Sequence, residues 1–194
     1  MLFLQGCPWQ CRYCHNPHLR SFEPETVGHP EPLSHWTWEK ALGVLRERVG
    51  FLDGVVFSGG EPTAHATLSE AIKEARALGY RIGLHTAGAY PERLKTILPL
   101  LDWVGLDIKA PLDARYDRIT GIKDSSRPVQ VSLSLLLSSG IPYQLRTTLH
   151  PQLHSYQDLK DLNGQLASLG AESAVIQQFR IQGCADPELI ASAA

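Results

Sequence analysis

The sequence predicts an α/β fold built on a parallel sheet, and three observations lead to this prediction. Short apolar, strand-like runs alternate with helix-like segments along the whole 194-residue chain. Regular alternation is typical of parallel strands joined by right-handed crossovers. The strand-like runs are nearly continuous in apolar residues, as expected when both faces of a sheet are covered. The chain shows no repeat and no linker, so we expect a single domain over residues 1–194.

Six runs are predicted as strands because each is short, apolar and bounded by polar or glycine residues. The predicted strands cover residues 2–4, 54–58, 80–85, 103–108, 142–148 and 174–179. Two architectures fit six strands that alternate with helices. One is an open doubly wound sheet, and the other is a partial barrel of six βα units. Alternation alone does not separate them.

Five segments between these runs carry apolar residues at helical spacing. They cover residues 38–49, 68–78, 91–101, 129–139 and 156–169. Glycines follow three of these segments, as is typical of helix C-caps, at Gly79, Gly140 and Gly170. Pro91 suits the first turn of its helix. A loop is predicted for the polar stretch that contains Pro24, Pro30 and Pro32.

Composition excludes several classes of protein. A net charge of −2 and a pI of about 6.4 do not suggest a nucleic-acid partner, which would favour a basic surface. The chain has no apolar run long enough to cross a membrane, and its start lacks the features of a signal peptide. We therefore expect a cytoplasmic protein with reduced thiols. Cys184 leaves an odd cysteine under any pairing, so a disulfide framework is not expected.

Three of the four cysteines lie in one short loop. Cys7, Cys11 and Cys14 follow the pattern Cys-x3-Cys-x2-Cys. Three thiolates can converge on one inorganic centre and leave one metal position open, which is the usual difference between a catalytic and a structural centre. The spacing indicates iron–sulfur ligation. The alternative is a structural zinc loop whose remote fourth ligand would be His15, His18 or Cys184.

Polar residues stand at the carboxyl end of every predicted strand. In parallel α/β folds, chemistry is found where the strands end and the next loops begin. The cysteine loop follows the first strand. The later strands end in Ser58–Pro62, His85–Gly88, Asp107–Lys109, Arg146–Thr148 and Gln178–Arg180. The simplest explanation is one concave site to which many strands contribute residues.

Two of these strand ends suggest specific chemistry. Gly59 and Gly60 would let a ligand approach the backbone closely, and Glu61 can accept hydrogen bonds from an ammonium group. A plain tight turn is the alternative. Asp107 and Lys109 alternate on a strand and therefore share a face, as functional groups or as an ordinary ion pair.

The cysteine loop, taken together with Gly59–Pro62, resembles the radical S-adenosylmethionine (SAM) enzymes. The longer run Leu4–Pro17, with Leu106–Lys109, is similar to the glycyl-radical-enzyme activases. Among these it is most similar to the anaerobic ribonucleoside-triphosphate reductase activating proteins. The resemblance extends from Leu2 to about Gly183. It implies that the fold is a partial (β/α)6 TIM-like barrel of the radical SAM type.

The resemblance also implies two cofactors and a set of site residues. A [4Fe–4S] cluster would be held by the catalytic cysteines Cys7, Cys11 and Cys14, and SAM would chelate its fourth iron. The implied SAM pocket consists of Tyr13, Gly59, Gly60, Glu61, Thr86, Asp107, Lys109 and Arg146. Tyr13 would lie near the adenine and Gly59–Glu61 would hold the methionyl amino group. Gln178 is a further candidate, for the ribose. Ordinary roles are open for Thr86 as a helix cap and for Arg146 as a surface residue.

The implied activity is an oxidoreductase that cleaves SAM reductively and generates a glycyl radical on a partner enzyme. The expected partner is an anaerobic ribonucleotide reductase, and flavodoxin or ferredoxin would donate the electron. Residues 15–53 contain no cysteine, which favours the short reductase-type activases over those with a ferredoxin-like insert. Such proteins usually carry residues ahead of the first strand, so we expect a trimmed or misplaced start and a weakly anchored strand.

Two other functions fit the same residues. One is a radical SAM enzyme that acts on a small molecule, similar to the short 7-deazaguanine synthases. The other is a non-catalytic metal-binding module, which predicts no cleavage of SAM.

Overall fold

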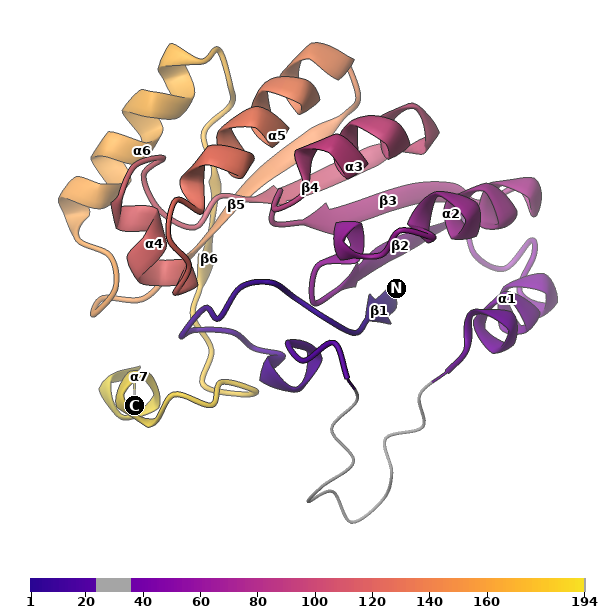
Figure 1. Ribbon diagram of the computed structural model, residues 1–194, viewed down its shortest axis with the longest axis horizontal. Helices are drawn as coiled ribbons and strands as arrows, with labels where there is room; N and C mark the ends of the chain where they lie inside the picture. The colour runs from indigo at the N-terminus through magenta and orange to yellow at the C-terminus, as the bar shows by residue number, and fades with distance from the viewer. Residues whose placement is uncertain (24–35, 194) are drawn as a thin grey trace.

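A six-stranded parallel sheet forms the centre of the molecule in the computed structural model, which describes residues 1–23 and 36–193 (Figure 1). Its strands are β1 (Leu2–Leu4), β2 (Gly54–Gly59), β3 (Arg81–Thr86), β4 (Trp103–Asp107), β5 (Tyr143–Leu149) and β6 (Val175–Gln178). Each strand pairs in parallel with the next one along the chain. All six predicted strands are therefore confirmed. The predicted loop with Pro24, Pro30 and Pro32 lies outside the described residues.

The order of the strands decides between the two architectures left open by the sequence. In a doubly wound sheet the order reverses at one point, so that helices cover both faces. Here the order runs from β1 to β6 without reversal, and right-handed crossovers then place the helices on one face. Figure 1 shows the helices that follow β2 to β5 along one side of the curved sheet, with the amino-terminal loop on the other side. The fold is a partial TIM-like barrel.

Five of the α-helices correspond to the predicted helical segments. They are α1 (Trp38–Glu47), α2 (Leu68–Ala77), α3 (Pro91–Ile97), α5 (Ser126–Ser139) and α6 (Tyr156–Ser168). Gly140 caps α5 in the left-handed conformation, with a φ of 70°. The structure adds α4 (Arg115–Thr120), α7 (Pro187–Ala193) and the 3-10 turns η1 (Pro17–Leu19), η2 (Pro62–Ala64) and η3 (Leu98–Leu100). These elements are too short to show a helical period in the sequence.

The hydrophobic core lies between the sheet and the helices. Strand residues such as Phe57, Leu84 and Leu106 are at most 1% exposed, and they pack with helix residues such as Ile72 and Leu133. Burial of each such side chain contributes roughly 1.5–3 kcal/mol. The core thus fixes the strand ends on which the polar residues stand.

The two edge strands are less covered than the sequence suggests. The expectation that every strand is covered on both faces is wrong for β6, because all four of its residues are exposed. Val175 and Ile176 are 47% and 46% exposed. β6 pairs only with β5 among the described residues. At the other edge, β1 pairs with β2 over three residues and its Phe3 is 57% exposed.

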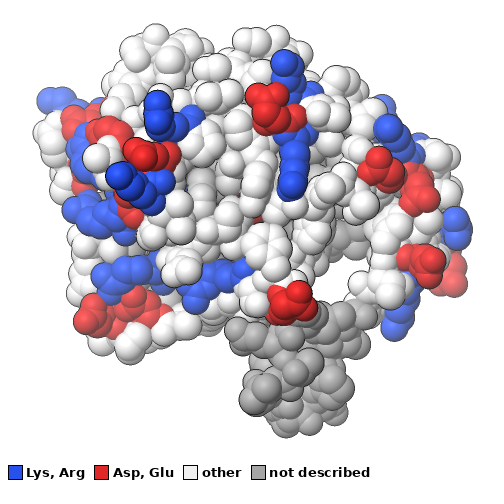
Figure 2. All heavy atoms as spheres, in the orientation of Figure 1, with Lys and Arg blue, Asp and Glu red and all other residues white. Residues whose placement is uncertain are grey.

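The surface shows no strong segregation of charge on the face seen in Figure 2. Lysine and arginine are interspersed there with aspartate and glutamate over the described residues. This mixture agrees with the near-neutral net charge of −2. None of the helices in the described ranges is long and apolar enough to span a bilayer.

Candidate active site

A cavity of about 190 Å³ opens where the cysteine loop meets the carboxyl ends of the strands. Its wall therefore draws on residues that lie far apart in the sequence. The predicted site residues that line it are Cys7, Cys11, Tyr13, Cys14, Gly59, Gly60, Thr86, Asp107, Lys109 and Arg146. Glu61 and the further candidate Gln178 do not line the cavity.

The cysteine loop is held in place by its backbone and by one large aromatic side chain. The Cys7 N–H donates to the Arg20 carbonyl at 2.9 Å, and the Gln10 N–H donates to the Thr120 carbonyl at 2.8 Å. Trp9 is 3% exposed and its ring packs edge-on against an aromatic ring of α4. The loop is thus anchored to η1 on one side and to α4 on the other.

The three cysteines form a donor set that fits an iron–sulfur cluster. All are free thiols that border one cavity. Burial raises the pKa of Cys7 to about 12 and also raises that of Cys11, so binding of metal must displace protons. Within residues 1–23 and 36–193, no three His, Cys, Asp or Glu side chains are grouped closely enough to hold one metal ion. A four-iron cluster separates its ligands more widely than a single ion does, and three thiolates on one loop suit it.

Two of the three residues considered as remote zinc ligands have other side-chain partners. His15 Nε2 accepts a hydrogen bond from the Arg180 N–H at 3.3 Å. Cys184 Sγ lies 3.6 Å from the Arg12 carbonyl, and His18 lines a different cavity. The geometry therefore favours the open, three-cysteine interpretation over a closed zinc site.

Gly59 and Gly60 are required by the close approach of the cysteine loop to β2. At Gly59, φ is 114° and a Cβ would lie 2.3 Å from the Leu4 nitrogen. At Gly60, a Cβ would lie 2.2 Å from the Gly6 carbonyl oxygen. The sequence suggested that these glycines admit a ligand, whereas their side-chain space is taken by the chain itself. Gly59 and Gly60 therefore position the cysteine loop by letting its backbone approach β2 closely.

Glu61 lies behind the cavity wall rather than in it. The side chain is fully buried, and its Oε1 accepts hydrogen bonds from Thr63 N, Thr63 Oγ1 and Thr86 Oγ1 at 2.6–3.0 Å. Its Oε2 accepts a hydrogen bond from the Ala87 N–H at 2.7 Å. Glu61 was expected to accept hydrogen bonds from an ammonium group of a ligand, and in the structure both of its oxygens bond to Thr63, Thr86 and Ala87. The carboxylate thus ties η2 to the end of β3.

Asp107, Lys109 and Arg146 form a charged row along the cavity. Two guanidinium nitrogens of Arg146 lie 2.7 and 2.9 Å from Asp107 Oδ1, and the sheet register pairs these two residues directly. Lys109 Nζ lies 3.8 Å from Asp107 Oδ2 and 5.6 Å from the ring centroid of Tyr13. The row carries two positive charges and one negative, so it attracts an anionic group of a ligand.

The Lys109 ammonium group keeps its charge in this site. Burial alone would lower its pKa, but the nearby acidic groups of Tyr13, Cys11 and Asp107 raise it, and the pKa lies well above its usual value. The side chain of Lys109 is 12% exposed, and that of Arg146 is 11% exposed. Both cations therefore act in a region with little water to screen them.

The cavity also contains residues to which the sequence assigned no role. Ser58 and His85 line it, and both bond to other residues of the wall. Gln177 lines it as well, whereas the ribose candidate Gln178 does not. Position is the signal that could have found them, because each stands within the last residues of its strand.

Comparison with known proteins places the chain in a family. The Radical SAM superfamily matches residues 1–162. A protein of Methanocaldococcus jannaschii, named as a candidate glycyl-radical enzyme activating enzyme, is 24% identical over 97% of this chain and 75% of its own length. The PqqA peptide cyclase of Gluconobacter oxydans is 34% identical over 74% of this chain, but over only 39% of its own length.

The fold is shared with SuiB of Streptococcus suis. TM-scores are 0.68 for SuiB bound to its precursor peptide SuiA and 0.67 for SuiB bound to S-adenosylmethionine, at 14% and 13% identity. The alignments cover 94% and 91% of this chain and 39% of SuiB. The chain thus spans less than half the length of the cyclase and of SuiB. Because the family match covers most of the chain, the protein belongs to the radical SAM superfamily, whose members use a [4Fe–4S] cluster and SAM.

Proposed function

We propose that this protein is an activase that generates a glycyl radical on a partner enzyme, with an anaerobic ribonucleoside-triphosphate reductase as the expected partner. The observation that carries the proposal is the similarity to the M. jannaschii relative along 97% of the chain. The length of the match supports this choice, because the alignment covers 75% of the M. jannaschii protein but only 39% of the peptide cyclase. The absence of cysteine from residues 15–53 is consistent with the short activases.

The chemistry that the cofactors supply when bound is the one-electron reductive cleavage of SAM to methionine and a 5′-deoxyadenosyl radical. The protein supplies position and exclusion of water. The thiolates of Cys7, Cys11 and Cys14 would hold the cluster at the cavity mouth. The partner would present a glycine whose Cα–H gives up a hydrogen atom, which leaves 5′-deoxyadenosine and a glycyl radical. Reduced flavodoxin or ferredoxin would supply the electron.

We assign the polar wall of the cavity to SAM itself. The cationic groups of Lys109 and Arg146 suit its carboxylate, and Asp107 suits its amino group. Gly59, Gly60 and Thr86 line the same cavity, and Glu61 accepts a hydrogen bond from Thr86 Oγ1 behind its wall. Tyr13 also lines the cavity, beside Lys109, where it would contact the adenine.

Cofactor chemistry is tested by anaerobic cluster reconstitution followed by reduction in the presence of SAM. We expect release of 5′-deoxyadenosine and methionine, and loss of both in Cys11→Ala. Cys184→Ala is the matched control, because this thiol lies outside the cavity and its loss leaves the three ligands intact. A colourless protein that holds stoichiometric zinc and cleaves no SAM would overturn the proposal.

The partner is tested by electron paramagnetic resonance after co-incubation with an anaerobic ribonucleotide reductase. A glycine-centred doublet on the reductase, absent when its radical-site glycine is replaced by alanine, supports the activase. The 34% identity with a PqqA peptide cyclase favours a second candidate, a radical SAM enzyme that modifies a peptide. A covalently changed peptide without a glycyl radical would favour that second function.

A further inference from the structure

His85, near the end of β3, connects three neighbouring strand ends across the cavity wall. Its Nε2 lies 3.0 Å from Arg146 Nη1 on β5, and its Nδ1 lies 3.3 Å from Ser58 Oγ on β2. An arginine has donors only, so His85 Nε2 must be the acceptor of that hydrogen bond. The ring proton is therefore on Nδ1, where it donates to the hydroxyl of Ser58. The contacts thus define both the charge and the tautomer of His85 as neutral and Nδ1-protonated.

The surroundings of His85 hold the ring in this orientation. The sheet register places His85 beside Gly105, where a Cβ would lie 2.9 Å from the imidazole Cδ2. The ring of Trp103 meets it edge-on with a centroid distance of 5.4 Å. The charged groups near the ring are Arg146 from β5 and Asp107 from β4. Burial and then Arg146 lower the pKa of His85, while Asp107 opposes them, so the ring is neutral at pH 7.

The guanidinium group of Arg146 is held from two sides, by Asp107 and by His85. Asp107 Oδ1 accepts a hydrogen bond from Nε and lies 2.7 Å from Nη2, and His85 Nε2 accepts from Nη1. A guanidinium group has five N–H donors, so at least one N–H on each terminal nitrogen is left over. The side chain is 11% exposed and lines the cavity. An N–H on each terminal nitrogen, in a site with little water, can form the fork that binds a carboxylate in bidentate fashion.

We propose that His85 is a positioning residue, which holds the guanidinium group of Arg146 so that its remaining N–H donors face the carboxylate of SAM. The inference deepens the assignment of this cavity to SAM and rests on it. The side-chain contacts of His85 are with Ser58, Arg146 and Trp103 rather than with the three cysteines. Its effect acts through Arg146, and it depends on the neutral state of the ring.

This role makes SAM binding depend on pH in a defined direction. Protonation of His85 removes the acceptor for Arg146 Nη1 and places a second positive charge against the guanidinium group. The pKa of His85 lies below its usual 6.5. The affinity for SAM should therefore be full at pH 7 and fall as the pH drops through this lowered pKa.

The experiment compares four variants of the full chain with a reconstituted, oxidised cluster, and measures SAM affinity calorimetrically from about pH 5 to pH 8. In His85→Leu we expect affinity at pH 7 to fall by about 10-fold, because a charged hydrogen bond loses its acceptor. His85→Gln keeps an acceptor near the Nε2 position and does not titrate, so we expect near-normal affinity without the acidic decline. Ser58→Ala removes only the Nδ1 partner and should weaken binding less.

His65→Gln is the matched control, because His65 bonds to the Gln5 carbonyl and does not line the cavity. It should retain both the affinity and the acidic decline of the parent protein. If His85→Gln keeps the decline, or if His85→Leu binds SAM as tightly as the parent, the proposal is wrong.

A second measurement does not need SAM. Nitrogen-15 spectra of histidine-labelled protein, recorded before and after cluster reconstitution, report which ring nitrogen carries the proton. We expect the Nδ1-protonated tautomer for His85, assigned by its loss in His85→Gln. An Nε2-protonated or charged ring at pH 7 would overturn the proposal even if a glycyl radical forms on the partner. Conversely, failure to form that radical would leave the tautomer and the pH profile unchanged.

Discussion

At the residue scale, the clearest requirement is for glycine at position 60. A Cβ there would lie 2.2 Å from the Gly6 carbonyl oxygen and 2.7 Å from that of Leu19, and both are backbone atoms that cannot turn away. For Gly60→Ala we expect a loss of about 2–4 kcal/mol in the free energy of unfolding, together with poor iron incorporation. Urea denaturation and iron per chain measure both.

The control for this substitution is Gly43→Ala on α1, where no atom lies within 4 Å of the new methyl group. Since alanine is the better helix former, this variant should gain up to about 1 kcal/mol and incorporate iron normally. Equal stability of the two variants would contradict the close packing of the cysteine loop against β2.

Glu61 provides a test of whether its carboxylate serves the fold or the ligand. In Glu61→Gln, an amide N–H₂ must replace one oxygen although every observed partner is a donor. We expect destabilisation by about 2 kcal/mol, measured by urea denaturation, with SAM affinity changed little in the fraction that folds. Glu47→Gln, at the exposed end of α1, should stay within about 0.5 kcal/mol of the parent. A large loss of SAM affinity without loss of stability would assign the carboxylate to the ligand instead.

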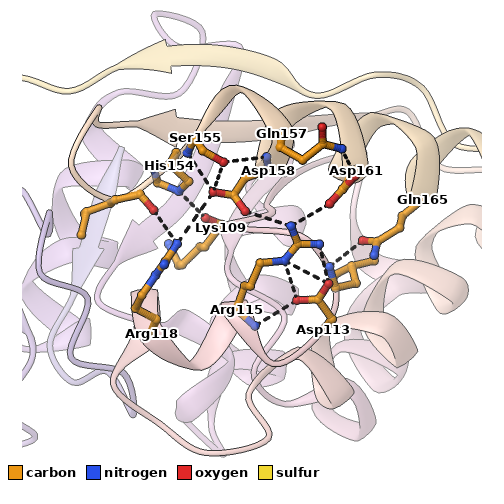
Figure 3. A network of polar contacts seen from close by, with 12 residues as sticks. Lys109, Asp113, Arg115, Arg118, His154, Ser155, Gln157, Asp158, Asp161 and Gln165 are labelled. Atoms are coloured by element: carbon orange, nitrogen blue, oxygen red, sulfur yellow. Dashed lines mark hydrogen bonds and ion pairs between the residues drawn. The ribbon is translucent and has the colours of Figure 1, made fainter.

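At the element scale, a polar network joins α4, α6 and the end of β4 (Figure 3). Asp158 accepts hydrogen bonds from Ser155 N and Oγ at 2.8 Å and so completes the capping box of α6. The Arg115 guanidinium group of α4 lies 2.9 Å from the same carboxylate. His154, next in the chain to Ser155, bonds through Nε2 to the Lys109 carbonyl at 2.9 Å. The network therefore holds the backbone that carries the Lys109 ammonium group.

Asp158→Asn should make the stability of the protein less dependent on acid pH. Burial raises the pKa of Asp158, but hydrogen bonds from Ser155 and Arg115 outweigh it and hold the pKa below its usual 3.8. A depressed pKa gives stability that is present above pH 4 and lost as the pH falls through the folded value. We expect the variant to be about 1–2 kcal/mol less stable at pH 7, with the difference shrinking as the pH falls below 3.8.

Thermal unfolding at several pH values measures this effect. Asp161→Asn is the control, because Asp161 also contacts Arg115 but its side chain is 32% exposed, so that solvent screens the pair. It should destabilise the protein much less than Asp158→Asn does. A gap between the parent and Asp158→Asn that stays constant down to pH 2 would contradict the role of the ionised carboxylate.

At the scale of the whole molecule, the carboxyl-terminal segment returns to the cysteine loop. Figure 1 shows this segment, in yellow, beside the indigo amino-terminal loop. Arg12 in the loop pairs with Asp186 at 2.6 Å and with Glu188 at 2.8 Å. These pairs are partly exposed and contribute little. The tighter contact is at Gly183, where φ is 85° and a Cβ would lie 2.2 Å from the His15 carbonyl oxygen.

Gly183→Ala should therefore loosen the cover over the cysteine loop. The new methyl group must displace backbone, and the positive φ adds strain, so the segment should shift away from His15. We expect the reconstituted cluster to bleach several-fold faster in air, followed by its visible absorbance, while unfolding in urea changes little. Gly164→Ala on α6, where no atom lies within 4 Å, should bleach at the parent rate. Equal rates in both variants would show that the segment does not protect the site.

Local patterns predicted most of the elements, but several features of the site depend on contacts that no local pattern contains. The helix α4 is six residues long and shows no period, yet it anchors the cysteine loop through Thr120. The sequence does not show that Glu61 bonds to Ala87, 26 residues further along the chain. Gln178 and Gln177 are neighbours, and only the direction of β6 decides which of them faces the cavity.

The sequence alone determined the alternation of strands and helices and the three-cysteine loop, because periodicity, glycine caps and ligand spacing are properties of short stretches. The tertiary structure decided the unreversed strand order, which makes the fold a partial barrel rather than a doubly wound sheet. It also decided that Arg146 meets both Asp107 and His85, residues 39 and 61 positions away. The physical reason is that parallel strands bring their carboxyl ends to one edge, so side chains from distant positions share a single site.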